Sequence, residues 1–470
     1  MMSQISRSII IAALFLAGCT RGPDYHPHST TDLAVPDEYV GGNDGISTAD
    51  ISEWWSRFND PVLEELIDTA LSENLDLAQS VARVTQARES LVQSGADQLP
   101  AINFFSSSGR NFNSDAPDSW SFSRSIDASW SADIFGGLKR SKQATFASYQ
   151  SAGYSLANVR TLIAAELARN YVSARSLQDR LRIAEESLRN QESNLQIAKW
   201  RAQAGLVSSV DVEQAKAQRA QTAAIIPLLE QSKAAARYRL AVLTGQAPGA
   251  VDGLLDTDAR LPAVPEFIAK GAPADILRQR PDILSSERDL AAATARIGVA
   301  QAQLFPSLTL TGNIGSISSD FGNLTDILTG GLFASIAHSI FDAGSRRSAV
   351  RSQVAAADGA FAAYRSAILN ALEEVENAAK YRRTAEARIS AFSDQSTASN
   401  NAAILTRANY RAGLIDFQRL LESERSLLSA NDSLAIAQAD RLTSAIQLYL
   451  ALGGGWQSVP QNANNEEASK

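Results

Sequence analysis

Apolar and polar side chains alternate along residues 119–133, which is the pattern of a β-strand with one apolar and one polar face. Trp120, Phe122 and Trp130 lie on the apolar side, which Arg124 alone interrupts, while serines and aspartates fill the other side. Such alternation is typical of a strand whose apolar face meets lipid and whose polar face meets water. A half-buried strand of a soluble β-sandwich would show a similar pattern, so the alternation by itself leaves both interpretations open.

Three further runs extend this pattern into two predicted β-hairpins, over about residues 101–134 and 306–341. Residues 101–113 form a weaker partner of the first run. In the second hairpin Leu308 and Leu310 alternate with polar residues, and a last short alternating run follows. We therefore expect four strands in the chain.

Two long stretches without proline predict unusually long helices, residues 138–204 and 345–412. At 1.5 Å per residue each would extend about 100 Å. A glycine ends each stretch, and returning helices are predicted over residues 206–245 and 414–453, with a kink at Pro227 in the first. Apolar residues recur every seven positions in the second returning stretch, as in a coiled coil: Leu421, Leu428, Ala435, Leu442 and Tyr449.

The order of landmark residues indicates that the chain is two copies of one unit. Residues recur 206 to 208 positions later in the same order: Asp76 as Asp282, Pro100 as Pro306, Ile134 and Phe135 as Ile340 and Phe341, Ala204, Gly205 and Leu206 as Ala412, Gly413 and Leu414, and Gly245 as Gly453. We predict a first structural repeat over residues 59–245 and a second over 273–453. A proline-containing, non-helical linker (246–272) joins them, and a C-terminal tail (454–470) follows.

The beginning of the chain has the composition of a bacterial lipoprotein signal peptide, residues 1–18. Arg7 precedes a short apolar run that ends in small residues and is too short to span a membrane. Cys19, the only cysteine in the chain, follows at the position where a lipoprotein signal would be cleaved. We expect Cys19 to carry covalent lipid, residues 19–58 to begin as a tether, and the protein to be anchored in the outer membrane. A plain signal peptide with a chance cysteine is the alternative.

The number of strands has a consequence for assembly. Four strands cannot close into a barrel, and an open sheet edge cannot be satisfied inside lipid. Two chains would supply eight strands around a packed interior, and three would supply twelve with room for a pore. A transmembrane pore therefore favours three or more copies.

Composition argues against several functions. There are 43 basic and 51 acidic residues, with a net charge of −8 and a pI near 5.2. Nucleic acid is therefore not an expected partner. The same acidic balance predicts a channel with a mild preference for cations. His26 and His28 lie in the tether and are expected to be solvated, and His338 lies in a predicted strand with a structural role. No nucleophile motif or phosphate-binding loop occurs. We predict no enzyme activity, no metal site and no cofactor other than lipid on Cys19.

An ordered set of short motifs carries a family resemblance. The motifs are Gly22-Pro23-Asp24-Tyr25, Trp54-Trp55 with Phe58 and Asp60-Pro61, Asp133-Ile134-Phe135-Gly136-Gly137, Ala204-Gly205-Leu206-Val207, Arg280-Pro281-Asp282-Ile283, Phe305-Pro306-Ser307 and Tyr410-Arg411-Ala412-Gly413-Leu414. From Cys19 to Trp456 the chain resembles outer-membrane efflux lipoproteins of the TolC/OprM family, in the NodT-like subgroup.

The resemblance implies an α+β membrane protein that forms a homotrimer. Its twelve-stranded β-barrel, four strands per chain, would continue into a long periplasmic α-helical coiled-coil barrel with two internal repeats per chain. The tether, linker and tail would contribute to an equatorial band. Such proteins are passive exit channels of tripartite pumps, and their partners are a periplasmic adaptor protein and an inner-membrane transporter, here expected to be of the proton-driven RND type.

The resemblance also places functional residues at the two helical hairpin tips. The expected adaptor contacts are Gly205, Leu206, Val207, Ser208, Gly413 and Leu414, and the expected periplasmic gate residues are Asp416, Tyr410, Arg411, Asp211 and Arg419. Asp211 and Arg419 lie six residues beyond the glycine of each tip. We hypothesise that they pair between neighbouring hairpins and hold the mouth shut, although solvated helix faces would show the same charges.

Three other functions are weaker interpretations. A porin for passive uptake has no need of long periplasmic helices. A lipid-anchored coiled-coil structural protein without a pore has no need of the alternating strands, and a lipid-anchored enzyme would require catalytic residues.

Overall fold

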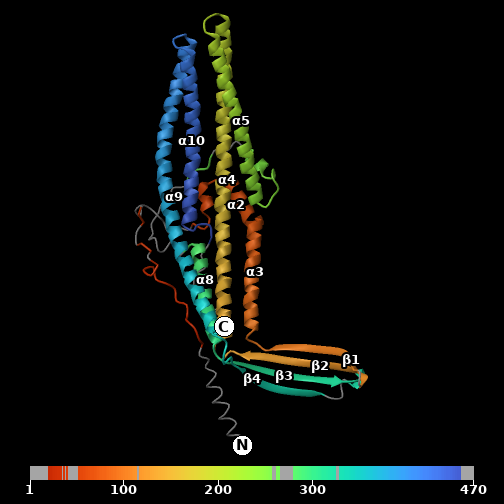
Figure 1. Cartoon of the computed structure of the whole chain (residues 1–470). Helices are drawn as coiled ribbons and strands as arrows, with labels where there is room; N and C mark the ends of the chain where they lie inside the picture. The colour runs from red at the N-terminus through yellow and green to blue at the C-terminus, as the bar shows by residue number, and fades with distance from the viewer. Residues whose placement is uncertain are drawn as a thin grey trace. The chain divides into compact units, whose positions relative to one another are not determined.

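The computed structural model describes residues 20–33, 35–36, 39–40, 51–113, 116–256, 261–264, 279–323 and 328–456. Within these residues the chain is mostly helical and contains four strands (Figure 1). The elements in chain order are η1 (Trp54–Phe58), α2 (Pro61–Glu73), α3 (Leu75–Ala96), β1 (Ala101–Asn113), β2 (Ala116–Ala132), α4 (Gly137–Gln203), α5 (Ser209–Leu243), α6 (Asp252–Leu255), α8 (Pro281–Ala302), β3 (Ser307–Ser318), η2 (Phe321–Asn323), β4 (Thr329–Ala337), α9 (Ser345–Arg411) and α10 (Phe417–Ala451).

Two sets of elements follow one another in the same order, α3-β1-β2-α4-α5 and α8-β3-β4-α9-α10. Helices α4 and α9 each have 67 residues, and α5 and α10 each have 35. At 1.5 Å per residue the two longest helices each extend about 100 Å. The predicted duplication, the strand pairs and the long helical hairpins are confirmed.

One local prediction needs correction. The stretch predicted as a non-helical linker contains one helical turn, α6, whose first residue Asp252 places a carboxylate at the helix N-terminus, where the dipole favours it. Pro227 lies inside helix α5, and the kink expected there stays a prediction. A proline inside a helix removes one backbone hydrogen bond, and contacts with neighbouring helices can compensate for that loss.

The strands form one antiparallel sheet in the order β1-β2-β3-β4. The register places Phe104 opposite Ile126, and Ile126 opposite Ile314, so that these three exposed apolar side chains lie on one face. β1 and β4 are the outer strands of this sheet. In the part of the chain that the structure describes, no helix is long and apolar enough to cross a membrane.

The chain divides into two compact units, and each unit draws on both repeats. The first contains Met1–Leu33, Val81–Ser155 and Asp282–Ala367, and therefore all four strands. The second contains Ala34–Ser80, Leu156–Pro281 and Ile368–Lys470. The division passes through α3, α4 and α9 and after the first residue of α8, and the free ends of both helical hairpins belong to the second unit.

The core of the second unit is built around η1. Trp54 is fully buried, stacks on Tyr449 of α10 with 5.5 Å between ring centroids, and meets Phe58 edge-on. Helix α2 covers this cluster with its apolar side and is capped by Asp60, whose carboxylate accepts backbone hydrogen bonds from the first turn. The hydroxyl of Tyr171 in α4 donates to the other oxygen of that carboxylate at 2.7 Å.

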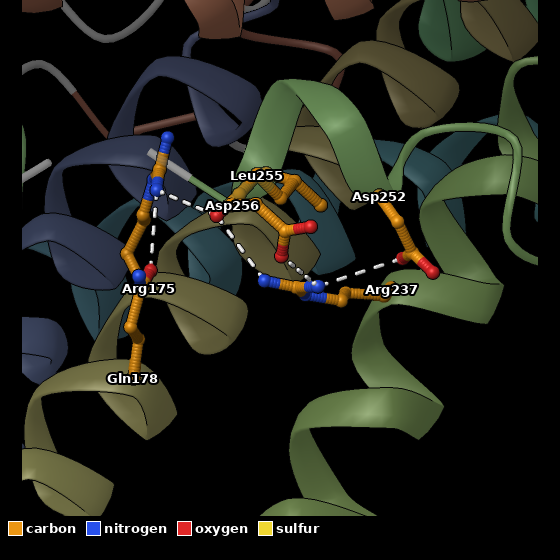
Figure 2. A network of polar contacts seen from close by, with 6 residues as sticks. All are labelled: Arg175, Gln178, Arg237, Asp252, Leu255 and Asp256. Atoms are coloured by element: carbon orange, nitrogen blue, oxygen red, sulfur yellow. Dashed lines mark hydrogen bonds and ion pairs between the residues drawn. The ribbon is translucent and has the colours of Figure 1, made fainter. Parts of the chain in front are cut away.

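A polar network in the same unit fixes the start of the linker (Figure 2). The backbone carbonyl of Leu255, at the end of α6, accepts hydrogen bonds from Arg175 of α4 at 3.2 Å and from Arg237 of α5 at 3.1 Å. Arg237 also forms an ion pair with Asp256 at 2.7 Å and a longer one with Asp252 at 3.6 Å. Cationic side chains at a helix C-terminus satisfy carbonyls that lack partners within the helix.

Two predictions about histidines were wrong. His28 is half-buried and packs against Phe361 with 4.7 Å between ring centroids, so it is not simply solvated. His338 lies one residue beyond β4 and is exposed. Strand ends and packing partners depend on contacts between distant segments, which local alternation does not report.

Candidate functional site at the hairpin tips

The first helical hairpin turns at Gly205, between α4 and α5 (Figure 1). The Gly205 N–H donates to the carbonyl of Ala202 at 3.0 Å, and the Leu206 N–H donates to the carbonyl of Arg201 at 2.8 Å. This pair of bonds is the Schellman motif, which requires a left-handed residue just after the helix. Gly205 fulfils that requirement with φ of 72°.

The second hairpin, between α9 and α10, has the same turn. The Gly413 N–H donates to the carbonyl of Tyr410 at 3.0 Å, and the Leu414 N–H donates to the carbonyl of Asn409 at 2.9 Å. Gly413 has φ of 77°. The repeated Ala-Gly-Leu sequence therefore encodes one tip geometry twice.

A polar side chain caps each returning helix. Ser208 accepts a hydrogen bond from the N–H of Val210 at 3.2 Å, and Asp416 accepts one from the N–H of Arg419 at 2.9 Å. Serine and aspartate are among the preferred residues at this position. The predicted gate residue Asp416 thus has a local structural role at the start of α10, which is compatible with a further role in the gate.

The tips expose apolar side chains. Leu206 is 68% exposed and Leu414 is 73% exposed, each just beyond the glycine of its turn. Val207 is half-buried, and Ser208 is exposed. Each of the two matching turns therefore leaves one leucine exposed to solvent.

Directly below the turns, the two hairpins of one chain pack together. All four long helices contribute buried side chains to one apolar cluster: Leu195 and Ala198 from α4, Ala215 from α5, Tyr410 from α9, and Phe417, Leu420 and Leu421 from α10. Tyr410 and Phe417 are in ring contact at 5.4 Å. The tips are therefore coupled by packing within the subunit.

Arg201 joins the two tips directly, and the sequence analysis missed it. Its guanidinium donates to the backbone carbonyl of Tyr410 at 2.8 Å and lies over the Tyr410 ring at 4.7 Å. Burial raises the pKa of Tyr410, Arg201 opposes that shift, and the negative charge of Asp211 adds to it. Asn409 occupies the position of Arg201 in the second repeat, so comparing the repeats gives no signal for this contact.

The remaining predicted gate residues differ in their surroundings. Asp211 is half-buried and close enough to Tyr410 to influence its pKa, whereas Arg411 and Arg419 are exposed. Among the described residues of this one chain, no salt bridge joins Asp211 to Arg419. The hypothesis concerned neighbouring hairpins, and it stays a prediction.

Cys19 lies outside the described residues, but the segment that follows it is firmly held within the first unit. Arg140 of α4 is almost fully buried and donates to the carbonyls of Arg21 at 3.0 Å and Gly22 at 2.9 Å. It also pairs with the carboxylate of Asp24 at 2.7 Å. One arginine thus fixes the Gly-Pro-Asp-Tyr motif and the residue before it through three acceptors.

Acid should release this N-terminal segment. The hydrogen bond from Arg140 and its charge hold the pKa of Asp24 below the ordinary 3.8. Because this pKa is lowered in the folded protein, the contact contributes stability above the unfolded pKa and loses it as pH falls through the folded value. We expect pepsin to cleave residues 20–25 increasingly below pH 3.8. Asp24→Asn should weaken the pH dependence of that cleavage. Asp32→Asn should not, because among the described residues the Asp32 carboxylate bonds to nearby Ser29 and not to Arg140.

No group of three or more histidine, cysteine, aspartate or glutamate residues suited to a metal occurs in the part of the chain that the structure describes. The features that the structure does provide at the tips are turns, caps, apolar contacts and one arginine.

Comparison with known proteins agrees with this architecture. The family described as outer membrane efflux protein matches residues 66–246 and 272–454. Nodulation protein T of Rhizobium leguminosarum bv. trifolii is 31% identical over 95% of this chain and 97% of its own length. The pyoverdine export outer membrane protein OpmQ of Pseudomonas aeruginosa strain PAO1 is 32% identical over 98% of this chain and 99% of its own length.

Solved structures show the same fold. The outer-membrane channel OprN superposes with a TM-score of 0.85 at 33% identity, covering 94% of this chain and 100% of its own. CusC, described in connection with transmembrane channel formation, gives a TM-score of 0.81 at 28% identity over 93% of this chain and 100% of its own. The predicted fold class and family resemblance are confirmed. With both repeats matched and near-complete coverage by channel proteins, the chain belongs to the outer membrane efflux protein family and is an outer-membrane efflux channel.

Proposed function

We propose that this chain is a homotrimeric, passive exit channel, the outer-membrane component of a tripartite pump. The observation that carries the proposal is the four-stranded sheet, with one apolar face and two unpaired outer strands, joined to long helical hairpins. Unpaired edges are costly in lipid, and three copies would remove them by closing a twelve-stranded barrel. The protein performs no chemistry of its own in this proposal and needs no cofactor.

The hairpin tips support a proposal about the partner proteins. The exposed leucines and caps of both turns, with Gly205, Leu206 and Leu414 at their centre, form the proposed contact surface for a periplasmic adaptor. An inner-membrane transporter, of the proton-driven RND type in our proposal, would supply energy and substrate. Relatives include a pyoverdine export protein and a cation efflux protein, so cargo differs among similar channels.

We further propose that lipid on Cys19 anchors the protein in the outer membrane. The support is sequence position together with the fixed segment that begins at Thr20. The backbone N–H of Arg21 donates to the carbonyl of Phe135 at 3.2 Å, close after β2, and the Arg21 guanidinium lies over the ring of Phe305, just before β3. This placement would bring acyl chains on Cys19 near the end of the sheet.

Native mass spectrometry of protein extracted from membranes in detergent tests the assembly. We expect a trimer whose subunits lack residues 1–18 and carry the extra mass of acyl chains. A folded monomer that is soluble without detergent would contradict the channel and favour a lipid-anchored coiled-coil protein. A trimer without acyl mass would contradict only the lipid anchor.

The tips are proposed to close the channel at rest. Replacing Asp211 and Arg419 by alanine should raise resting conductance in planar bilayers, because the pair would no longer join neighbouring hairpins. Arg201→Ala should also raise it, since the link to the Tyr410 carbonyl is lost. Lys216→Ala, which removes a surface ion pair with Glu213, is the control and should leave conductance unchanged. Unchanged conductance in the Asp211 and Arg419 variant would rule out their pairing.

A further inference from the structure

The polar face of the sheet carries a single charge. We define this face by the residues in register with Asp127: the odd-numbered positions of the four strands. Its side chains in the described strands are serine, threonine, asparagine and apolar residues, and Asp127 is the one ionisable group among them. The other charged strand residues, Arg110, Asp118 and Arg124, lie on the opposite face.

Asp127 lies in a row of polar residues that crosses the sheet. Asn103 of β1 is opposite Asp127, Asn313 of β3 is its partner on the other side, and Gly331 of β4 follows Asn313. The hydroxyl of Ser125 donates to the Asp127 carboxylate at 2.8 Å. The row therefore presents a carboxylate between two carboxamides, and the ring of Phe333 lies beside Gly331 at its β4 end.

The carboxylate of Asp127 has no cationic partner among the described residues, where no lysine, arginine or histidine forms a salt bridge with it. Asp118 differs, because Arg110 pairs with it at 3.0 Å on the opposite face. An unpaired, oriented carboxylate on a surface of neutral polar groups dominates the local electrostatic potential.

Resting on the proposed trimeric channel, we propose that Asp127 is a selectivity-determining residue of the barrel and favours the passage of cations over anions. The apolar face must meet lipid, so the polar face lines the lumen. Threefold symmetry then repeats Asp127 at one level of the pore, as a ring of three carboxylates. Rings of charged side chains are a general basis of ion selectivity in channels.

Reversal potentials in planar bilayers, measured on the full-length trimer across a KCl gradient, test this inference. Asp127→Asn should lower the cation-to-anion permeability ratio by about twofold or more at ~0.1 M salt, where the Debye length is ~10 Å. The effect should shrink at ~1 M salt, where that length is ~3 Å. Asp127→Glu should retain selectivity, and Asp118→Asn, on the opposite face, should leave it unchanged.

The outcomes separate this inference from the function on which it rests. If the wild-type protein forms no channels, the proposed function fails. If it conducts and Asp127→Asn has unchanged selectivity, the inference alone is overturned.

Thiol labelling tests the orientation of the face independently, because Cys19 is the only natural cysteine. A water-soluble thiol reagent should modify the Asp127→Cys variant and spare Ala128→Cys, which is on the lipid side. The reverse pattern would place Asp127 outside the lumen and overturn the proposal.

Discussion

Replacing Gly245 by alanine should destabilise the protein much more than the same change at Gly205. Gly205 follows α4 and Gly245 follows α5, each in a turn of the same type, with nearly identical φ of 72° and 71°. A methyl group at Gly205 would meet nothing within 4 Å, whereas one at Gly245 would lie 2.4 Å from the carbonyl oxygen of Glu73 at the end of α2. Left-handed strain alone costs about 1 kcal/mol, and overpacking against backbone should raise the total to about 3 kcal/mol or more.

The thermal unfolding midpoint of the detergent-solubilised protein, followed by circular dichroism, measures this difference. Gly205→Ala is the matched control, because it has the same backbone strain without the steric conflict. Equal shifts for the two variants would show that α5 and α2 do not approach as closely at Gly245 as the structure indicates.

Removing Arg407 should have the second large effect, because it would leave the buried carboxylate of Glu424 without its partner. Two guanidinium nitrogens of Arg407 in α9 donate to the two carboxylate oxygens of Glu424 in α10, with 2.8 Å between Nη2 and Oε2. The Glu424 side chain is only 2% exposed. The hydrogen bond to Glu424 raises the pKa of Arg407. An unpaired buried charge costs about 3–5 kcal/mol, and Arg407→Ala should lower stability by that order.

The chain provides a matched comparison at the surface. Arg219 of α5 contacts Glu192 of α4 at 2.7 Å, with side chains 42% and 47% exposed. Arg219→Ala should cost about 1 kcal/mol or less, because water replaces the lost partner. Replacing both Arg407 and Glu424 by methionine should recover most of the loss measured for Arg407→Ala. If that double variant is as unstable as Arg407→Ala, the unpaired charge is not the cause.

Much of the fold follows from local pattern. Helix α4 is observed over Gly137–Gln203 and was predicted over 138–204, and α9 is observed over Ser345–Arg411 and was predicted over 345–412. The absence of proline and the glycine at each end suffice for these bounds. The strands were predicted with similar success, because alternation with a period of two is a property of the strand itself.

Only part of the candidate site could be predicted from local sequence pattern. The repeated Ala-Gly-Leu sequence located both tips, and their turns have the geometry that such a sequence predicts. Arg201 was missed, because its acceptor is the carbonyl of Tyr410, more than two hundred residues away in the chain. An arginine in the last turn of a helix is also common, so its local position gave no sign of this contact. The contacts of Arg140 were missed for the same reason, because its acceptors in the N-terminal segment are far from it in the chain.

The sequence by itself therefore determined the elements, their duplication, the position of the tips and the family, because periodicity, proline placement and turn glycines act through neighbouring residues. Only the tertiary structure decided which of these residues bear the largest energetic weight. Gly205 and Gly245 have the same local role, yet only Gly245 lies against another backbone. Arg219 and Arg407 both pair with glutamate, yet only Arg407 holds a buried carboxylate. Burial and close approach arise from segments far apart in the chain, and they set the free energy of each contact through solvent exclusion.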